Sequence, residues 1–207
     1  MQPNKLVIYG KVISIEESHR VVGSVFYRYL ISIPRMSGTC DIVPLIVSDK
    51  LLYRNKIAVN DYITSIGEVR TLNKESNNKT KLLVFGFANS IKVIKEAEFN
   101  EVQNKNVVYL EGYIVRNPIS RETTKGVYIT DLIIAHNRSY KKVSYIPAIA
   151  WGIQSQYAKH LHVGAYVLAT GRFQSRTYYS NNEEKIVYEL SILSIEESQP
   201  AKKEVLV

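Results

Sequence analysis

Aromatic rings and guanidinium groups recur at even spacing in the C-terminal half of the sequence. Arg172, Arg176 and Tyr178 are separated by even numbers of residues, so on a β-strand their side chains point to one face. Tyr145 and Trp151 are six residues apart and share a face in the same way. Rings that stack on bases, together with cations that contact phosphates, are the means by which proteins hold single-stranded nucleic acid. This spacing therefore predicts a surface for a polyanion with accessible bases.

A polar segment at residues 137–142 adds further cations to this set. Tyr140 lies there, beside Arg138, Lys141 and Lys142. Any one of the rings is more often packed in a core or an interface than bound to a ligand. The even spacing of Arg172 and Arg176 favours binding instead, because cations without a partner are almost never buried in a core.

Composition agrees with an anionic partner and excludes several other classes of protein. The 207 residues include 27 Lys and Arg against 19 Asp and Glu, a net charge of +8, and 45% are hydrophobic, as in a folded chain. No apolar run approaches the ~18 residues of a membrane helix, and no secretion signal is present, so we expect a cytoplasmic, nucleoid-associated protein. Cys40 and the four histidines lack metal-ligand spacing. We expect no metal, no cofactor and no catalytic residues.

The elements that position these side chains occur twice in the chain. Residues 6–12 resemble residues 108–114 at an offset of 102, and residues 60–67 resemble residues 163–171 at an offset of 104. In the second copy, short runs rich in β-branched and aromatic residues predict five strands, and apolar spacing predicts a helix at 153–161. The strands are expected at 107–115, 127–136, 143–151, 165–178 and 185–195, with a polar hairpin tip at 180–184.

This element order predicts an all-β fold of two tandem five-stranded OB-fold barrels, with one short helix in each. In the first copy the helix is expected at 49–57 and a hairpin tip at 73–78. We predict a degenerate OB-fold domain at 1–97, a charged linker at 98–106, a binding domain at 107–197 and a short tail at 198–207.

From residue 107 to about residue 195, the second copy resembles the bacterial single-stranded DNA-binding proteins. The resemblance follows Val-Tyr-Leu-Glu-Gly-Tyr-Ile-Val at 108–115, the segment 132–140, Tyr-Ile-Pro-Ala-Ile-Ala-Trp-Gly at 145–152 and Gly-Arg-Phe-Gln-Ser-Arg-Thr-Tyr at 171–178. It implies base stacking by Tyr140, Tyr145, Trp151 and Tyr178, beside phosphate contacts from Arg138, Lys141, Lys142, Arg172 and Arg176. The implied function is single-stranded DNA binding without sequence preference in replication, recombination and repair. Relatives with two barrels pair into homodimers, so four barrels are expected to act together.

The first copy and the tail depart from that family. By the repeat offset, the positions of the first copy that correspond to Tyr145 and Trp151 are Asp41 and Val47. Neither is aromatic, so a stacking platform is missing from the first copy. Its cations either follow phosphates or form a solvated surface; they are Arg28, Arg35, Arg70, Lys74, Lys79 and Lys81. The tail lacks the family's acidic tip, which leaves contacts with replication proteins open. The alternative function is an OB-fold interaction module that assembles a replication complex, in which the aromatic residues would form an interface.

Overall fold

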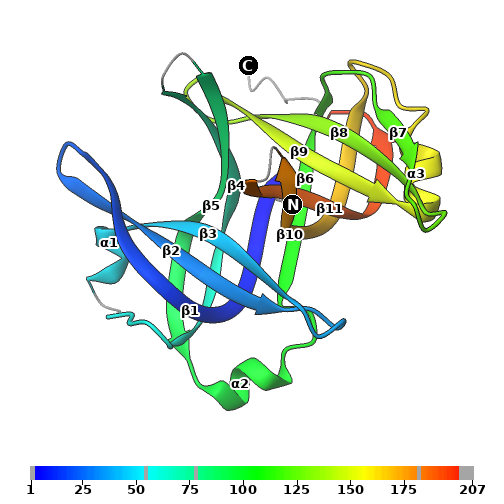
Figure 1. The fold of residues 1–207 in the computed structure, drawn as a ribbon. Helices are drawn as coiled ribbons and strands as arrows, with labels where there is room; N and C mark the ends of the chain where they lie inside the picture. Colours follow the sequence, from blue (N-terminus) through cyan, green and yellow to red (C-terminus); the bar gives the residue numbers. More distant parts are fainter. Residues whose placement is uncertain (1–2, 54–55, 77–78, 181–182, 201–207) are drawn as a thin grey trace.

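The computed structural model describes residues 3–53, 56–76, 79–180 and 183–200, and it confirms the all-β prediction (Figure 1). The N-terminal barrel contains β1 (Asn4–Val21), β2 (Ser24–Pro34), β3 (Cys40–Ser48), α1 (Asp49–Leu52), β4 (Tyr62–Ser76) and β5 (Lys79–Ile94). Strand β1 pairs with both β2 and β4, and parallel pairing of β3 with β5 closes the barrel. The predicted order of three strands, a helix and two strands is therefore present.

The C-terminal barrel repeats this order with one additional strand. It contains β6 (Asn106–Ile114), β7 (Ile119–Glu122), β8 (Tyr128–Asn137), β9 (Val143–Trp151), α3 (Gly152–Ala158), β10 (Tyr166–Ser180) and β11 (Glu183–Ser198). Strand β6 pairs with β8 and β10, and parallel pairing of β9 with β11 closes the barrel. Strand β7 was not predicted; it is exposed along its whole length and pairs with β8 at the edge of the sheet.

Both predicted helices end earlier than their sequence patterns indicate. The α3 helix stops at Ala158, because the next amides donate to carbonyls three residues back: His160 N to Tyr157 O at 3.1 Å and Leu161 N to Ala158 O at 3.2 Å. Helix α1 ends at Leu52. The predicted linker includes part of a third helix, α2 (Glu96–Glu101). The predicted hairpin tips include residues 77–78 and 181–182, which, like tail residues 201–207, lie outside the described part.

The two barrels are related by an approximate twofold arrangement around the pairing of β1 with β6. Leu6 lies opposite Val108, which is its own equivalent at an offset of 102. An interface in which each contact has a mirror-related copy is isologous, as in a symmetric dimer. The side chain of Asn4 bonds to both backbone groups of Val69, at 2.8 and 3.0 Å, and Asn106 does the same to Phe173, at 2.7 and 2.9 Å. A single chain thus has the internal organisation of a dimer.

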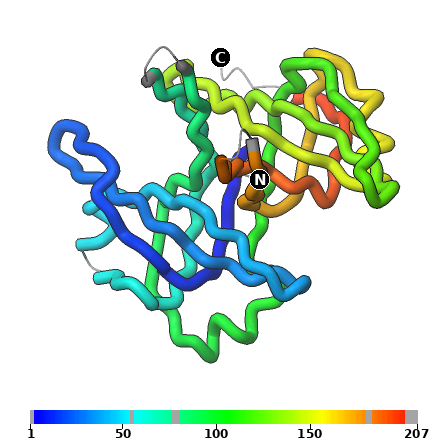
Figure 2. The backbone as a smooth tube through the Cα atoms, in the orientation of Figure 1, coloured from blue at the N-terminus to red at the C-terminus, as the bar shows by residue number. Residues whose placement is uncertain are grey.

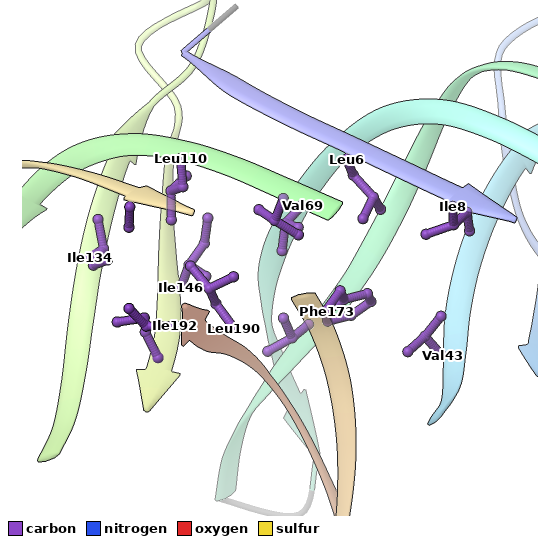
Figure 3. Packing of buried hydrophobic residues seen from close by; sticks show 14 of the residues in the cluster. Leu6, Ile8, Val43, Val69, Leu110, Ile134, Ile146, Phe173, Leu190 and Ile192 are labelled. Atoms are coloured by element: carbon purple, nitrogen blue, oxygen red, sulfur yellow. The ribbon is translucent and has the colours of Figure 1, made fainter. Parts of the chain in front are cut away.

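One continuous core runs through both barrels. Leu6, Ile8 and Val43 belong to the N-terminal barrel, and Leu110 and Ile134 to the C-terminal one, yet all are part of the same buried cluster. Figure 3 shows Val69 and Phe173, at equivalent positions of β4 and β10, near the middle of this cluster. Because burial of apolar area is the main stabilising term in folding, the shared core holds the barrels in one fixed arrangement.

The register of β3 differs by one residue from the register that the repeat offset predicts. Leu45 pairs with Gly86 and Ala148 pairs with Leu190; because Gly86 and Leu190 are equivalent, β3 and β9 are related by an offset of 103. The positions equivalent to Tyr145 and Trp151 are therefore Ile42 and Ser48, and the prediction of Asp41 and Val47 was wrong. A slip of one residue exchanges the two faces of a strand, which is why Val47 is buried in the core. Neither Ile42 nor Ser48 is aromatic.

A glycine marks the bulge at the same point of each barrel. The register of β4 with β5 shifts between Ile66 and Gly67, and that of β10 with β11 shifts between Thr170 and Gly171. A Cβ atom at Gly67 would lie 2.1 Å from the carbonyl oxygen of Phe87. Only glycine fits this close approach of two strands, because every other residue type carries a Cβ.

Candidate nucleic-acid interface

The outer face of β9 carries two of the predicted stacking rings. Trp151 is 39% exposed and Tyr145 is 45% exposed, while Ile146, Ala148 and Ala150 point into the core between them. The alternation of the strand therefore places both rings on the solvent side, as their spacing predicted. Each ring has an accessible surface on which a base can stack.

Trp151 lies at the rim of an open pocket together with both predicted arginines of β10. The pocket has a volume of about 850 Å³. Arg172 and Arg176 line it from β10, and Arg35 and Cys40 reach it from the N-terminal barrel. The structure thus brings Trp151, Arg172 and Arg176 together, which the sequence predicted, and adds a wall from the other barrel, which it did not.

Arg176 is paired with a carboxylate on the neighbouring strand. Its Nε donates to Glu189 Oε1 at 3.0 Å, and its Nη2 donates to Oε2 at 3.3 Å. This hydrogen bonding raises the pKa of Arg176. Gln174 also donates to Glu189, at 2.8 Å. These bonds hold the guanidinium of Arg176 beside the pocket that it lines.

Arg172 and Arg35 share one buried carboxylate, that of Asp41. Asp41 is only 1% exposed and accepts two hydrogen bonds from Arg35, while Arg172 Nε lies 3.9 Å from Asp41 Oδ2. Burial lowers the pKa of Arg172, and the positive charge of Arg35 lowers it further. Two guanidiniums beside a single carboxylate leave one positive charge uncompensated, and this charge faces the pocket.

Arg35, predicted as an accessory phosphate contact, joins the two barrels. In addition to its bonds to Asp41, its Nη2 donates to the carbonyl oxygen of Ser175, at 3.1 Å. Ser175 N donates to Asp41 Oδ1 at 3.0 Å, and Ile42 N donates to Ser175 Oγ at 2.9 Å. We call this group the Asp41 contact; it consists of Arg35, Asp41, Ile42, Arg172 and Ser175.

A second contact occupies the mirror-related place between β4 and β9. Thr71 N donates to Ser144 Oγ at 3.3 Å, and Tyr145 N donates to Thr71 Oγ1 at 2.9 Å. Offsets of 103 and 104 make Ser144 the equivalent of Asp41, and Thr71 the equivalent of Ser175. We call this group the Ser144 contact; it consists of Thr71, Ser144 and Tyr145. It fixes the backbone of Tyr145, one of the predicted stacking residues.

Arg138 stands where Arg35 stands in the other contact, and here the carboxylate is missing. Its Nε is buried and has no hydrogen-bond partner among the described residues. Burial lowers the pKa of Arg138, and nearby Arg70 lowers it further, whereas Glu68 raises it. Glu68 itself is bonded to Arg70. Arg138 and Arg70, predicted separately from different barrels, therefore lie near enough for their charges to interact, and the nearby carboxylate of Glu68 is bonded to Arg70.

The loop that carries the remaining predicted residues is exposed and conformationally unusual. Tyr140 is 94% exposed, and Tyr140 and Lys141 have positive φ angles of 59° and 55°. Non-glycine residues seldom adopt this conformation, and such residues are concentrated at functional sites. Lys141 and Lys142 are also exposed. Figure 1 shows the loop between β8 and β9 next to the β4–β5 hairpin of the other barrel.

The remaining predicted residues lie further out. Tyr178, near the end of β10, is 39% exposed, and Tyr179 beside it is more exposed still. Arg28 donates to Glu16 at 2.7 Å. Lys74 lies directly opposite Lys81 in the β4–β5 hairpin, and both are exposed. The side chain of Lys79 lies outside the described part of the structure.

Sequence reasoning missed a row of flat groups on the outside of the N-terminal barrel. His19 stacks on Phe26 with ring centroids 4.7 Å apart, Phe26 lies 6.0 Å from Phe87, and the guanidinium of Arg70 lies 3.6 Å from the Phe87 centroid. These residues come from β1, β2, β5 and β4. No short sequence window contains them, so the only available signal was the alternation of each strand taken separately.

Two further properties bear on the class of site. Within the described residues, no group of three or more His, Cys, Asp or Glu side chains is arranged to hold a metal ion. Among the helices in the same part of the chain, none is both long enough and apolar enough to cross a membrane.

Comparisons with known proteins point to one family. Residues 105–197 match the model of the single-strand binding protein family. A single-stranded DNA-binding protein of Halalkalibacterium halodurans is 29% identical over 96 residues, covering 43% of this chain and 56% of that protein. One of Caldanaerobacter subterraneus is 31% identical over 80 residues, covering 35% of this chain and 53% of that protein. The chain thus spans about half the length of these curated relatives.

The fold is also similar to that of a solved protein over nearly its whole length. The wild-type single-stranded DNA-binding protein of Thermus aquaticus superposes with a TM-score of 0.70, covering 95% of this chain and 93% of that chain, at 17% identity. At this identity the likeness concerns the fold alone, and it supports the arrangement of two tandem OB-fold barrels.

Proposed function

We propose that the protein binds single-stranded DNA without sequence preference, a function supported by the match of residues 105–197 to the model of the single-strand binding protein family. The observation that carries the proposal is the position of Trp151. It is a half-exposed ring at the rim of a pocket that two arginines line from β10. A base stacked on this ring would place its phosphate within reach of Arg172 and Arg176.

The proposed site uses rings for the bases and cations for the backbone. Every base has a π face, so stacking on Tyr140, Tyr145, Trp151 and Tyr178 holds a strand without reading its sequence. Phosphates are proposed to contact Arg138, Lys141, Lys142, Arg172 and Arg176. Two of these arginines support the proposal most directly: Arg172 shares its carboxylate with Arg35, and the buried Nε of Arg138 has no hydrogen-bond partner within the described ranges. A phosphate would supply the missing negative charge in both places.

The biological role that follows is protection of exposed single strands during replication, recombination and repair. This is a binding role, and no catalytic step is assigned to any residue. We also propose that two chains pair into a homodimer, so that four barrels act together. We further propose that replication proteins contact this chain.

The fluorescence of Trp151 tests the proposal directly, because it is the only tryptophan in the chain. We expect oligo(dT) to quench it strongly. Titrations with duplex DNA and with RNA of equal length establish which nucleic acid the site prefers. Replacing Trp151 with Ala should cost about 1–3 kcal/mol of binding free energy. The matched control is Ile153→Ala, an exposed apolar residue of α3 outside the site.

Salt dependence gives the second measurement for the same proposal. Each phosphate contact with a single strand lowers log K by about 0.7 per unit of log salt. Unquenched fluorescence together with a flat salt response would contradict DNA binding and favour the alternative interaction module, in which Trp151 faces another protein.

A further inference from the structure

We infer that the N-terminal barrel carries a second binding surface for unpaired bases, the row formed by His19, Phe26, Phe87 and Arg70. The inference rests on the proposed function, since it assumes that a single strand binds the C-terminal barrel. The residues of this ring row are not the equivalents of the stacking residues of the other barrel. Those equivalents, Ile42 and Ser48, are not aromatic.

The ring row lies outside the core of its barrel. Phe26 and Phe87 are half-buried and His19 is exposed, whereas Tyr29 on the strand of Phe26 and Ala88 beside Phe87 point inward and are buried. None of the three rings belongs to the buried cluster that stabilises the fold. Packing of the barrel interior therefore does not account for the alignment of these rings.

Close contacts order the ring row at both ends. The planes of His19 and Phe26 are inclined by only 1°, at 4.7 Å, Phe87 is tilted by 39° to Phe26, and the guanidinium carbon of Arg70 lies 3.6 Å from the Phe87 centroid. The row ends in an imidazole on one side and a guanidinium on the other. Unpaired bases stack both on aromatic rings, histidine included, and on guanidinium planes, so each end can extend the row by one base.

The row approaches the proposed site of the other barrel through Arg70. Arg70 and Arg138 are close enough for the charge of one to lower the pKa of the other. The Nε atoms of both are buried without a hydrogen-bond partner among the described residues. A phosphate placed here would receive hydrogen bonds from both barrels, and the strand would continue from Tyr140 and Arg138 to the ring row.

The neighbouring hairpin supplies further positive charge along the same route. Lys74 and Lys81 lie directly opposite one another on β4 and β5. Like charges in this cross-strand position are destabilising, and a bound phosphate relieves their repulsion. Figure 2 shows the β4–β5 hairpin beside the loop between β8 and β9.

One difference in residue type, a phenylalanine at the position of a serine, explains why the rings occupy different places in the two barrels. Phe87 is the equivalent of Ser191, and Ser191 lines the Trp151 pocket. In the N-terminal barrel, Phe87 therefore occupies the space that is a pocket in the other barrel. Ser48 is the equivalent of Trp151, and Phe26 lies directly opposite Ser48 on the neighbouring strand. The N-terminal barrel therefore has a ring one strand away from the position that Trp151 occupies in the other barrel.

The test compares a short and a long oligonucleotide. An OB-fold covers about 4–16 nucleotides, so oligo(dT) of about 8 nucleotides occupies one barrel and oligo(dT) of about 35 reaches both. We expect His19→Ala and Phe26→Leu to weaken binding of the long strand about 5- to 150-fold, the loss of one stacked base, with little effect on the short one. The matched control is Arg20→Gln, an exposed cation of the same hairpin that is paired with Glu17.

The outcomes separate this inference from the proposed function. If the unmodified protein does not bind the short strand, the proposed function fails. If it binds both strands and the two ring-row variants bind the long strand as tightly as the unmodified protein does, the second surface is overturned. Thermal unfolding of each variant establishes that it is folded, which is expected for His19→Ala because that side chain is exposed.

A fluorescent reporter examines the ring row itself. Phe26→Trp combined with Trp151→Phe places the only tryptophan in the row and keeps a ring in the C-terminal site. We expect the long strand to quench this reporter and the short strand to quench it much less. A reporter that binds the long strand with unchanged fluorescence would overturn the inference, because base stacking at Phe26 would alter the emission of the new ring.

Discussion

The two contacts between the barrels have the same hydrogen-bonding pattern and different charges. In each, a hydroxyl on β10 or β4 accepts from the amide of the facing strand: Ser175 from Ile42 at 2.9 Å, and Thr71 from Tyr145 at 2.9 Å. The return bond goes to Asp41 in one contact and to Ser144 in the other. The repeated fold has kept the groups that align the backbones and changed the charged group beside them.

This exchange determines what each contact can do. In the Asp41 contact, Arg35 is satisfied by a buried carboxylate and by the Ser175 carbonyl. Beside the Ser144 contact, Arg138 retains a buried Nε without a partner among the described residues, as Arg172 does beside Asp41. Because an unpaired buried cation is costly, an anionic ligand is stabilised beside Arg138 much more than beside Arg35. We therefore assign Arg35 and Asp41 to stability, and we propose that Arg138, like Arg172, contacts phosphate.

The largest expected effect is the loss of the buried carboxylate. Asp41→Ala should lower the free energy of unfolding by about 3 kcal/mol, because Arg35 is left without its partner. Ser144→Ala, its mirror-related control, should cost about 1 kcal/mol, the value of an ordinary hydrogen bond. Urea unfolding measures both. Equal losses would show that the two contacts do not differ as proposed.

The next comparison concerns the stacking positions. Tyr145→Ala should weaken oligo(dT) binding by about 1–3 kcal/mol, because one stacked base is lost. Ile42→Ala, at the equivalent place in the N-terminal barrel, should leave the affinity unchanged. Fluorescence titration of Trp151 measures both variants. A weaker affinity in Ile42→Ala alone would reverse the proposed roles of the two barrels.

A smaller effect is expected in the salt dependence of binding. Arg138→Gln should reduce the slope of log K against log salt by about 0.7, the value of one phosphate contact. Arg35→Gln should leave the slope unchanged and lower the unfolding free energy instead. Titrations at several salt concentrations decide the matter, and an unchanged slope in Arg138→Gln would remove that residue from the proposed site.

The smallest effect near neutral pH concerns two equivalent tyrosines. Tyr166 donates to Glu111 at 2.6 Å and Tyr62 to Glu96 at 2.7 Å. Burial, together with this bond, raises the pKa of Tyr166 to about 12. Because the folded state holds this proton more tightly, its stabilisation is complete below the ordinary value of about 10 and is lost as the pH rises toward the folded pKa.

Unfolding measured at rising pH examines this tyrosine comparison. Tyr166→Phe should remove the alkaline loss of stability that originates in the C-terminal barrel. Tyr62→Phe is the matched control at the equivalent position of the N-terminal barrel. The pKa of Tyr62 is raised chiefly by its bond to Glu96, whereas burial is the main cause for Tyr166. An alkaline transition that survives in Tyr166→Phe would assign it to another group.

The parts of the fold that could be predicted are those that short-range alternation determines. Strand β9 was predicted at the residues it occupies, because it is a short run rich in β-branched and aromatic residues, with exposed rings at Tyr145 and Trp151 and buried residues between them. The outward positions of Tyr145 and Trp151 follow from the same alternation. Strand β7 was missed because all four of its residues are exposed and show no contrast between two faces.

The features that the sequence did not reveal concern relations between distant segments. The offset between the repeats changes from 102 to 103 to 104 along the chain, because loop lengths differ, and a slip of one residue is enough to exchange faces. The pairing of Arg176 with Glu189 connects two strands across a hairpin. Nothing in either segment alone indicates the partner of the other.

The sequence by itself determined two OB-fold barrels, the faces of their strands and the basic, aromatic character of the C-terminal one, because these properties depend on residue type and on a period of two. Tertiary structure decided which charges are compensated, that Arg70 approaches Arg138, and that His19, Phe26 and Phe87 align. Such contacts depend on register and on the shared core between the barrels, both of which are set by packing over the whole chain.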